Sequence, residues 1–350
     1  MKKISSAIFL LAFFVFTNCK NNAELAEAEA KNQAAKDFYH AIIKLGYGFV
    51  DVFNAIGGLV SDVFYKADPK KSDVKNYFDS IAKILKDTQT KLDALSKEQG
   101  GGDGGTQVVD AAKKASEWIK EMHKAVDDTA KAGEGGSESI ANVAAGGADA
   151  AGAGAKADAK SVTGIAKGMK AIVDAAGKAG VELKAAAAGG AAGNAGNDAG
   201  KLFASGGNAH AGAAADAQGA AEAAGKAVSA VSGDQILKAI VDAAGATAGK
   251  GAATAANAVE AAIGADGAAG AAFAADGGMN KNDQIAAAIV LRGLAKGGKF
   301  ANANAANTKV VAAVKSAVES GVQKTMSSLT SLVKQSIVGE LGKVANVVQT

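Results

Sequence analysis

Large apolar residues recur at alternating spacings of four and three along the first part of the chain. Such spacing places them on one face of an α-helix. The first stripe ends before Asp68-Pro69, because the residue preceding a proline disfavours helical backbone. Glycines within the stripe predict helix breaks near Leu45 and Gly57. The stripe consists of Phe38, Ile42, Leu45, Phe49, Val52, Ile56, Leu59 and Val63.

Two further stripes carry most of the remaining large side chains. The first predicts a helix that starts at Ser72 or Asp73, the second predicts a helix over residues 108–126, and Gly100–Gly105 form a loop between them. We expect these helices to form the fixed core. Their apolar positions are Val74, Tyr77, Phe78, Ile81, Ile84, Leu85, Leu92 and Leu95, then Val108, Ala112, Ala115, Ile119, Met122 and Val126, with Trp118 beside them.

Between about Gly133 and Gly278 large side chains become scarce, and alanine and glycine dominate. A segment with so few large apolar groups buries little area per residue, so we expect it to rest on the core rather than to fold alone. Asp234 and Asp283 open two similar sequences, and each is predicted to cap a helix N-terminus. The predicted helical patches in the glycine-rich segment are Val162–Ala176, Asp234–Ala244 and Ala252–Ile263.

Large apolar residues return in the last part of the chain, close to the helical period of about 3.6 residues. They predict one long C-terminal helix without aromatic residues on its stripe. The first N-terminal stripe contains aromatic residues, so the two terminal helices are predicted to pack against each other. The C-terminal positions are Val311, Val314, Val318, Val322, Met326, Leu329, Val333, Ile337, Leu341, Val344 and Val348.

The composition favours an all-α protein without internal disulfide bonds. The chain has 45 glycines, a single proline and a single cysteine, Cys19, and alanine is the best helix former. The formal net charge is +3, and this near-neutral balance argues against nucleic-acid binding, which needs a strong basic patch.

The first residues have the pattern of a secretory signal with a lipid-attachment cysteine. Two lysines precede an apolar run, Ile4–Phe16, and Cys19 follows shortly after it. The run is too short to cross a bilayer about 30 Å thick as a helix. We therefore expect residues 1–18 to be cleaved and Cys19 to be lipidated, which leaves residues 19–350 as one helical domain. An ordinary signal peptide followed by an unmodified cysteine is the alternative.

The sequence offers little catalytic chemistry. The three histidines, His40, His123 and His210, lie far apart on different predicted elements, and no pair of ligands has a metal-binding spacing. No nucleophile motif of the Gly-x-Ser-x-Gly type is present. We therefore expect no enzymatic activity, no metal and no cofactor.

Two groups of lysines allow two interpretations. They alternate with acidic residues, which favours a solvated helix face. A salt-sensitive contact with sulfated glycans is the alternative. The groups are Lys66, Lys70, Lys71 and Lys75, then Lys113, Lys114, Lys120, Lys124 and Lys131.

The segment Met279–Ala301, with the sequence MNKNDQIAAAIVLRGLAKGGKFA, closely resembles an invariant segment of the variable surface lipoproteins of Borrelia. These comprise the variable large proteins (Vlp) and the related VlsE. Asp283–Gly293 is the most specific part. The signal, the aromatic N-terminal helices, the Ala/Gly-rich middle and the valine-rich C-terminus are similar as well, so the resemblance covers the full chain.

The resemblance implies an elongated helical bundle on the outer face of the outer membrane, with membrane-proximal N- and C-terminal helices and Ala/Gly-rich distal loops. The distal variable region would cover about residues 133–278. The implied function is antigenic variation, by which the protein evades host antibodies, and an adhesin for host glycans or cells is the alternative. We expect Ile285, Ile289, Val290, Leu291 and Leu294 to be fixed by packing within a helix rather than by a binding site.

Overall fold

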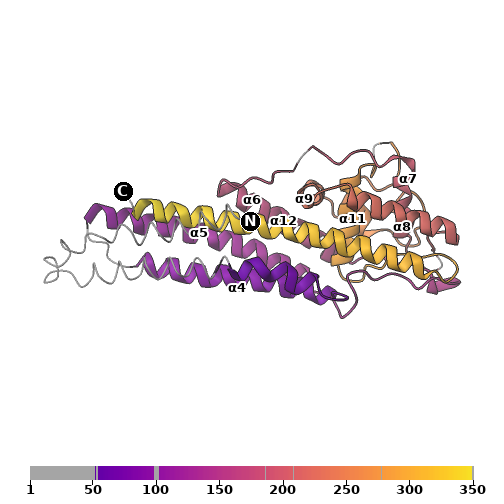
Figure 1. The fold of residues 1–350 in the computed structure, drawn as a ribbon, viewed down its shortest axis with the longest axis horizontal. Helices are drawn as coiled ribbons and strands as arrows, with labels where there is room; N and C mark the ends of the chain where they lie inside the picture. Colours follow the sequence, from indigo (N-terminus) through magenta and orange to yellow (C-terminus); the bar gives the residue numbers. More distant parts are fainter. Residues whose placement is uncertain are drawn as a thin grey trace.

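The computed structural model describes residues 52, 54–97, 102–185, 187–207, 209–276 and 278–348. Every regular element within these ranges is a helix, and β pairing there is confined to isolated bridges. The predicted all-α class is confirmed (Figure 1). In chain order the elements are α4 Lys71–Leu95, α5 Gly102–Ala132, η3 Asp149–Ala151, α6 Ala159–Lys178, α7 Gly193–Asn197, η4 Asp198–Phe203, α8 Ala214–Ser229, α9 Gly233–Ala243, α10 Ala258–Ile263, α11 Asn282–Leu294 and α12 Thr308–Val348.

The molecule is elongated and has two different ends (Figure 1). At the narrow end, on the left of the figure, α4 and α12 finish and α5 begins. At the broad end the short helices and connecting segments surround the first half of α12. The 41 residues of α12 correspond to about 60 Å of helix at 1.5 Å per residue. This helix therefore joins the two ends into one body.

The N-terminal stripe packs on α12, as the sequence predicts, over the part that the structure describes. Residues 54–64 form a helix in which Phe64 accepts a hydrogen bond through its carbonyl from Gln323 Nε2 at 2.9 Å. Gly57 lies beside Lys334, which like Gln323 belongs to α12. The earlier residue of the N-terminal helix thus meets the later residue of α12, so the two helices run antiparallel. The predicted break at Gly57 is wrong, because the helix continues through it. Residues 38–51 lie outside the described ranges.

The aromatic side chains of α4 link it to both terminal segments. Tyr77 and Phe78 are fully buried, and the Tyr77 ring centroid lies 5.4 Å from that of Phe64. The Tyr77 hydroxyl shares a hydrogen bond of 2.6 Å with Thr330 Oγ1 on α12. Burial raises the pKa of this hydroxyl, so it stays neutral. The helix starts at Lys71, before the predicted Ser72 or Asp73.

At the broad end, one helix forms where the sequence predicts none. Other helices there begin at residues that differ from the predicted ones. The α8 helix is unpredicted because its buried side chains are alanines and one valine, which give no stripe of large residues. The predicted patch over Ala252–Ile263 is helical only from Ala258. The predicted caps Asp234 and Asp283 are wrong: both lie inside the first turn, and the N-caps are Ser232 and Lys281.

Small residues in these helices permit close approach between neighbours. The Gly321 position on α12 faces Val290 of α11 and Val228 of α8, and a Cβ there would lie 2.9 Å from Val290 Cγ2. Gly293 of α11 likewise faces Val318. Buried residues of both ends form one continuous apolar cluster. Alanine and glycine therefore contribute to the core by shortening the distance between helices.

We predict opposite effects for two glycine substitutions in α6. A Cβ on Gly168 would overlap the Thr129 hydroxyl on α5 and lie 2.8 Å from Thr129 Cβ. The G168A change should therefore destabilise the protein by about 1–3 kcal/mol through overpacking. The matched change G177A meets nothing within 4 Å and should stabilise the helix by up to about 1 kcal/mol.

Urea denaturation of both variants, followed by circular dichroism, measures the difference. Equal stability of the two variants would show that α5 and α6 are not in such close contact.

Candidate functional site

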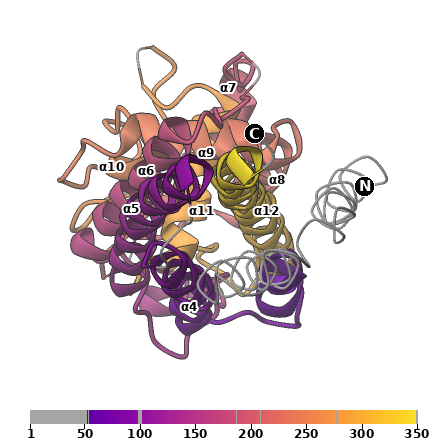
Figure 2. The same ribbon diagram turned by 90° about the vertical axis from the view of Figure 1, so that its left-hand side faces the viewer.

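Helix α11 lies at the centre of the broad end. It contains Asp283–Gly293, the part of the sequence with the most specific resemblance to the Borrelia lipoproteins. All residues from Ile285 to Leu294 are buried. The helix contacts α4, α6, α8, α9, α10 and α12. Figure 2, which looks along the molecule from its narrow end, places α11 among these surrounding helices. The predicted burial of this segment is thus confirmed.

Lys71 holds the C-terminal end of α11. Its Nζ atom donates hydrogen bonds to the carbonyl oxygens of Gly293 at 2.9 Å, Ala295 at 2.6 Å and Arg292 at 3.2 Å. The last carbonyls of a helix have no partner within the helix and carry partial negative charge. The fully buried amine therefore supplies three donors where the helix end needs them.

Burial lowers the pKa of Lys71 to about 7, because removal from water disfavours the charged amine. Glu138 raises this pKa and Arg292 lowers it. The three carbonyl acceptors favour the protonated form, which has the larger number of donors. Two opposing effects therefore set the protonation state of Lys71: desolvation favours the neutral amine, and the hydrogen bonds to the carbonyls favour the charged one.

Arg292 is a second buried cation on the same helix. It is fully buried, and burial lowers its pKa to about 9. Its Nε donates to the Ala262 carbonyl at 3.0 Å, and its Cζ lies 4.7 Å from the Phe203 ring centroid. Phe203 packs in turn on Phe273 and Phe300. This arrangement combines a cation–π contact with hydrogen bonds to the end of α10.

Arg292 is the single arginine of the chain, and its planar group both stacks on a ring and donates in several directions. One donor, Nη1, has no hydrogen-bond partner. Its position within the apolar sequence Val290–Leu294 is a signal for a buried role. The role of Lys71 gives no such signal, because the sequence places it among surface lysines.

The remaining lysines of the two groups are mostly paired with carboxylates. Lys66 pairs with Asp73, Lys70 with Asp68 and Lys75 with Asp79. On α5, ion pairs join Lys113 to Asp110, Lys124 to Asp128 and Lys131 to Asp127. This supports the interpretation as a solvated helix face. The two groups of lysines therefore do not form continuous positively charged surfaces.

The histidines are not brought together. His123 lies on α5, and His210 lies in a segment of the broad end with Nδ1 buried and without a partner. His40 and Cys19 lie outside the described residues. Within the described ranges no group of three or more His, Cys, Asp or Glu side chains is arranged to hold a metal ion.

Comparison with known proteins assigns the family. The sequence profile described as Borrelia lipoprotein matches residues 49–348. Variable large protein 12 of Borrelia hermsii is 34% identical over 364 residues, which cover 100% of this chain and 93% of that protein. The chain belongs to the Borrelia variable surface lipoprotein family. Variable large protein 14 of the same organism is 33% identical and covers 100% of the chain and 94% of its own length.

The fold of this Borrelia lipoprotein is shared with a solved relative. The crystal structure of VlsE, the Lyme disease variable surface antigen of Borrelia burgdorferi, has a TM-score of 0.72 and 43% identity. The match covers 89% of this chain and 99% of VlsE. In the described part of the chain, no helix is both long and apolar enough to span a bilayer.

We predict that K71M destabilises the protein by about 1–3 kcal/mol, because methionine leaves the α11 carbonyls without donors in a buried site. The matched variant K75M, one turn further along α4, removes only an exposed ion pair and should change stability by less than about 1 kcal/mol. Urea denaturation measures both values.

The pH dependence of the free energy of unfolding provides a second test with the K71M variant. Between pH 7 and pH 10.5 the unfolded chain keeps the Lys71 proton more readily than the folded chain, so the free energy of unfolding should rise with pH. K71M should flatten this rise between about pH 7 and pH 9. A wild-type slope in K71M would contradict the buried position of the amine.

Proposed function

We propose that this protein is an outer-surface lipoprotein and an immunodominant variable antigen, whose distal surface changes so that host antibodies lose their target. The observation that carries the proposal is the division between α11 and its surroundings. Ten consecutive residues of α11 are buried, whereas the segments that cover the broad end are rich in small residues and have many partly or fully exposed positions. Surface changes away from a core usually alter stability by less than about 0.5 kcal/mol.

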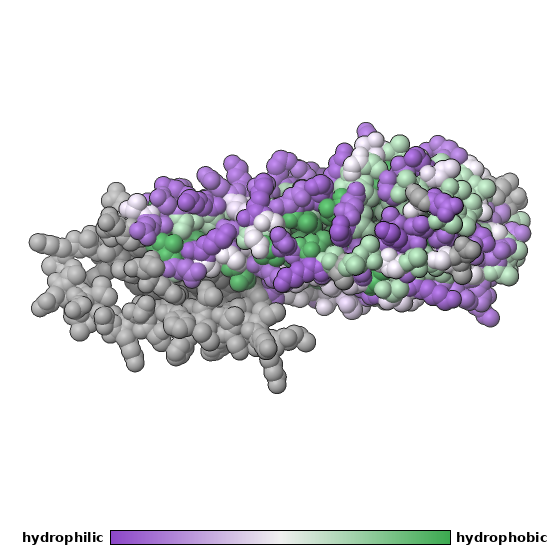
Figure 3. Space-filling view, turned by 90° about the horizontal axis from the view of Figure 1, so that it is seen from above, coloured by the Kyte–Doolittle hydropathy of each residue, from purple (hydrophilic) through white to green (hydrophobic). Residues whose placement is uncertain are grey.

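The broad end has a suitable surface for such changes. Exposed positions are frequent among the described residues of 182–191, 206–216 and 245–251, the second of which runs into the start of α8. On the face seen in Figure 3, hydrophilic and moderately hydrophobic residues are mixed over this end. Loops also accept changes in length at a small entropic cost. Within the proposed variable region of about residues 133–278, we therefore expect these segments to vary most.

The narrow end is the proposed membrane-proximal end. The helix at 54–64 runs antiparallel to α12, and α12 ends at the narrow end (Figure 1). When the helix at 54–64 is followed toward its N-terminus, it therefore runs toward the narrow end. Cys19, the proposed site of the lipid, precedes this helix in the sequence. Anchoring by acyl chains requires more than one chain for stable attachment. Residues 1–18 are the proposed cleaved signal.

We include no enzymatic activity in the proposal. The two most strongly perturbed cations, Lys71 and Arg292, are engaged with helix carbonyls and an aromatic ring. Glycan adhesion through the two lysine groups receives no support from the ion pairs described above, so the antigen role is the function we propose.

The anchor is tested by replacing Cys19 with alanine. The C19A protein should move from the membrane fraction to the medium or the aqueous phase of a detergent partition, because the lipid is the proposed attachment. Its circular dichroism spectrum should match that of the wild type. Metabolic labelling with palmitate provides the direct control, since only the wild type should take up the label. Retention of the variant on the cell surface would exclude the lipid anchor.

The antigen role is tested by sequencing the expressed gene from successive isolates of one infection. Substitutions should gather in the exposed segments of the broad end and should be absent from the apolar positions of α11, because changes there would disturb a fully buried helix. Substitutions spread evenly between the broad end and residues 54–130 would contradict the proposed variable region.

A further inference from the structure

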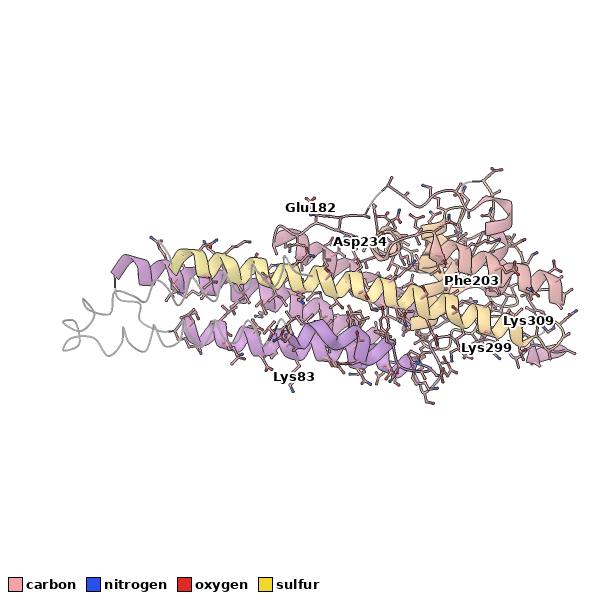
Figure 4. The ribbon with its side chains drawn as sticks, in the orientation of Figure 1. Lys83, Glu182, Phe203, Asp234, Lys299 and Lys309 are labelled. Atoms are coloured by element: carbon pink, nitrogen blue, oxygen red, sulfur yellow. The ribbon has the colours of Figure 1, made fainter. Side chains whose placement is uncertain are left out.

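An open cleft of about 370 Å³ lies in the broad end. This volume falls in the lower part of the range of about 300–1,000 Å³ that is typical of small-molecule sites. The segment 150–156 forms one wall and Ser205–Gly207 another, while Lys156, Asp266 and Lys299 supply the charged groups. Figure 4 labels Lys299 in this end of the molecule, which also contains Phe203.

The walls of the cleft are fixed by backbone hydrogen bonds between segments distant in sequence. Ala155 and Lys299 exchange two such bonds, at 3.0 Å and 3.1 Å. The Ser205 amide donates to the Ala268 carbonyl at 2.9 Å, and its hydroxyl donates to the Ala265 carbonyl at 2.6 Å. Gly154 packs so closely that a Cβ would lie 2.8 Å from the Ala301 nitrogen. The cleft is therefore formed before any ligand arrives.

The charges around the cleft are predominantly positive. Lys156 pairs with Asp266 at 2.7 Å, but both side chains are at least half exposed, and such pairs contribute little. In the described part of the chain, Lys299 forms no ion pair. One carboxylate thus faces two amines among the lining side chains.

The buried guanidinium of Arg292 stands behind the same wall. A Cβ added to Gly264 would touch Arg292 Nη2 and would lie 3.5 Å from Ser205 Oγ and 3.6 Å from Lys156 Cβ. Among the residues that the structure describes, Arg292 forms no ion pair with a carboxylate, and its Nη1 makes no hydrogen bond. Its charge acts across a wall of low dielectric constant, where it is screened less than a surface charge. The field at the cleft therefore favours an anion.

We propose that this cleft binds a small molecule that carries a carboxylate or phosphate group. The anion contacts the amines of Lys156 and Lys299 and displaces Asp266 from its exposed ion pair. Arg292 strengthens the attraction through its field and makes no contact with the ligand. The small side chains and glycines of the walls leave room for the rest of the molecule. This binding site is independent of the proposed antigen role.

The experiment follows amide resonances of the isotope-labelled full-length chain by nuclear magnetic resonance at low ionic strength. Sodium phosphate and sodium glucuronate are the two anionic probes, and glucose is the neutral control. Either anion should shift the amides of Gly154 and Ser205–Gly207 in a saturable manner, whereas glucose should not. Saturation by phosphate alone assigns a phosphate-bearing ligand, and tighter saturation by glucuronate assigns an acidic sugar.

Charge-neutralising variants separate this site from general attraction to lysines. K299Q should weaken the binding of the anion about tenfold, the loss expected for one charge-assisted hydrogen bond. K309Q removes the same charge from an exposed lysine of the broad end that does not line the cleft (Figure 4), and it should bind as the wild type does. Equal dissociation constants for the two variants, or no saturable shift with either anion, would overturn the proposal.

Discussion

The hydrogen bonds from the Lys71 amine to the last carbonyls of α11 connect parts of the chain that are more than 220 residues apart in sequence. They attach the start of α4, which belongs to the long-helix bundle, to the helix at the centre of the broad end. A buried helix end without donors would be strongly unfavourable. The contact between the start of α4 and the C-terminal end of α11 therefore depends on this one amine, while packing on the surrounding helices also holds α11 in place.

Arg292 performs a complementary task by connecting α11 to α10. It fixes the carbonyls at the end of α10 and the aromatic group around Phe203, from which the connecting segments of the broad end depart. Neither Lys71 nor Arg292 forms an ion pair within the described part of the chain, and two such buried cations are costly to desolvate. Backbone carbonyls and an aromatic face offset that cost here, which explains why the lone arginine of the chain lies in its most buried helix.

Under the proposed antigen role, this arrangement separates the residues that stay fixed from those that change. The helices of the broad end pack inward on α11 and α12, while the covering segments are joined to one another by isolated backbone bridges between positions distant in sequence, such as Ala191 with Lys281 and Ser205 with Ala268. Alanine and glycine in the helices shorten the distances between them, so a firm scaffold is built without large side chains.

The sequence by itself determined the helical class, the stripes of α4, α5 and α12, the pairing of the terminal segments and the buried nature of Ile285–Leu294. These follow from periodic apolar positions, which record burial along one element. Tertiary structure alone decided α8, whose face of alanines becomes apolar core only where α11 and α12 approach it. It also decided the caps at Ser232 and Lys281, the burial of Lys71 and the charge of the cleft around Lys299. The sequence does not distinguish a lysine that faces water from one that binds a distant helix end, because only the fold brings its hydrogen-bond partners to it.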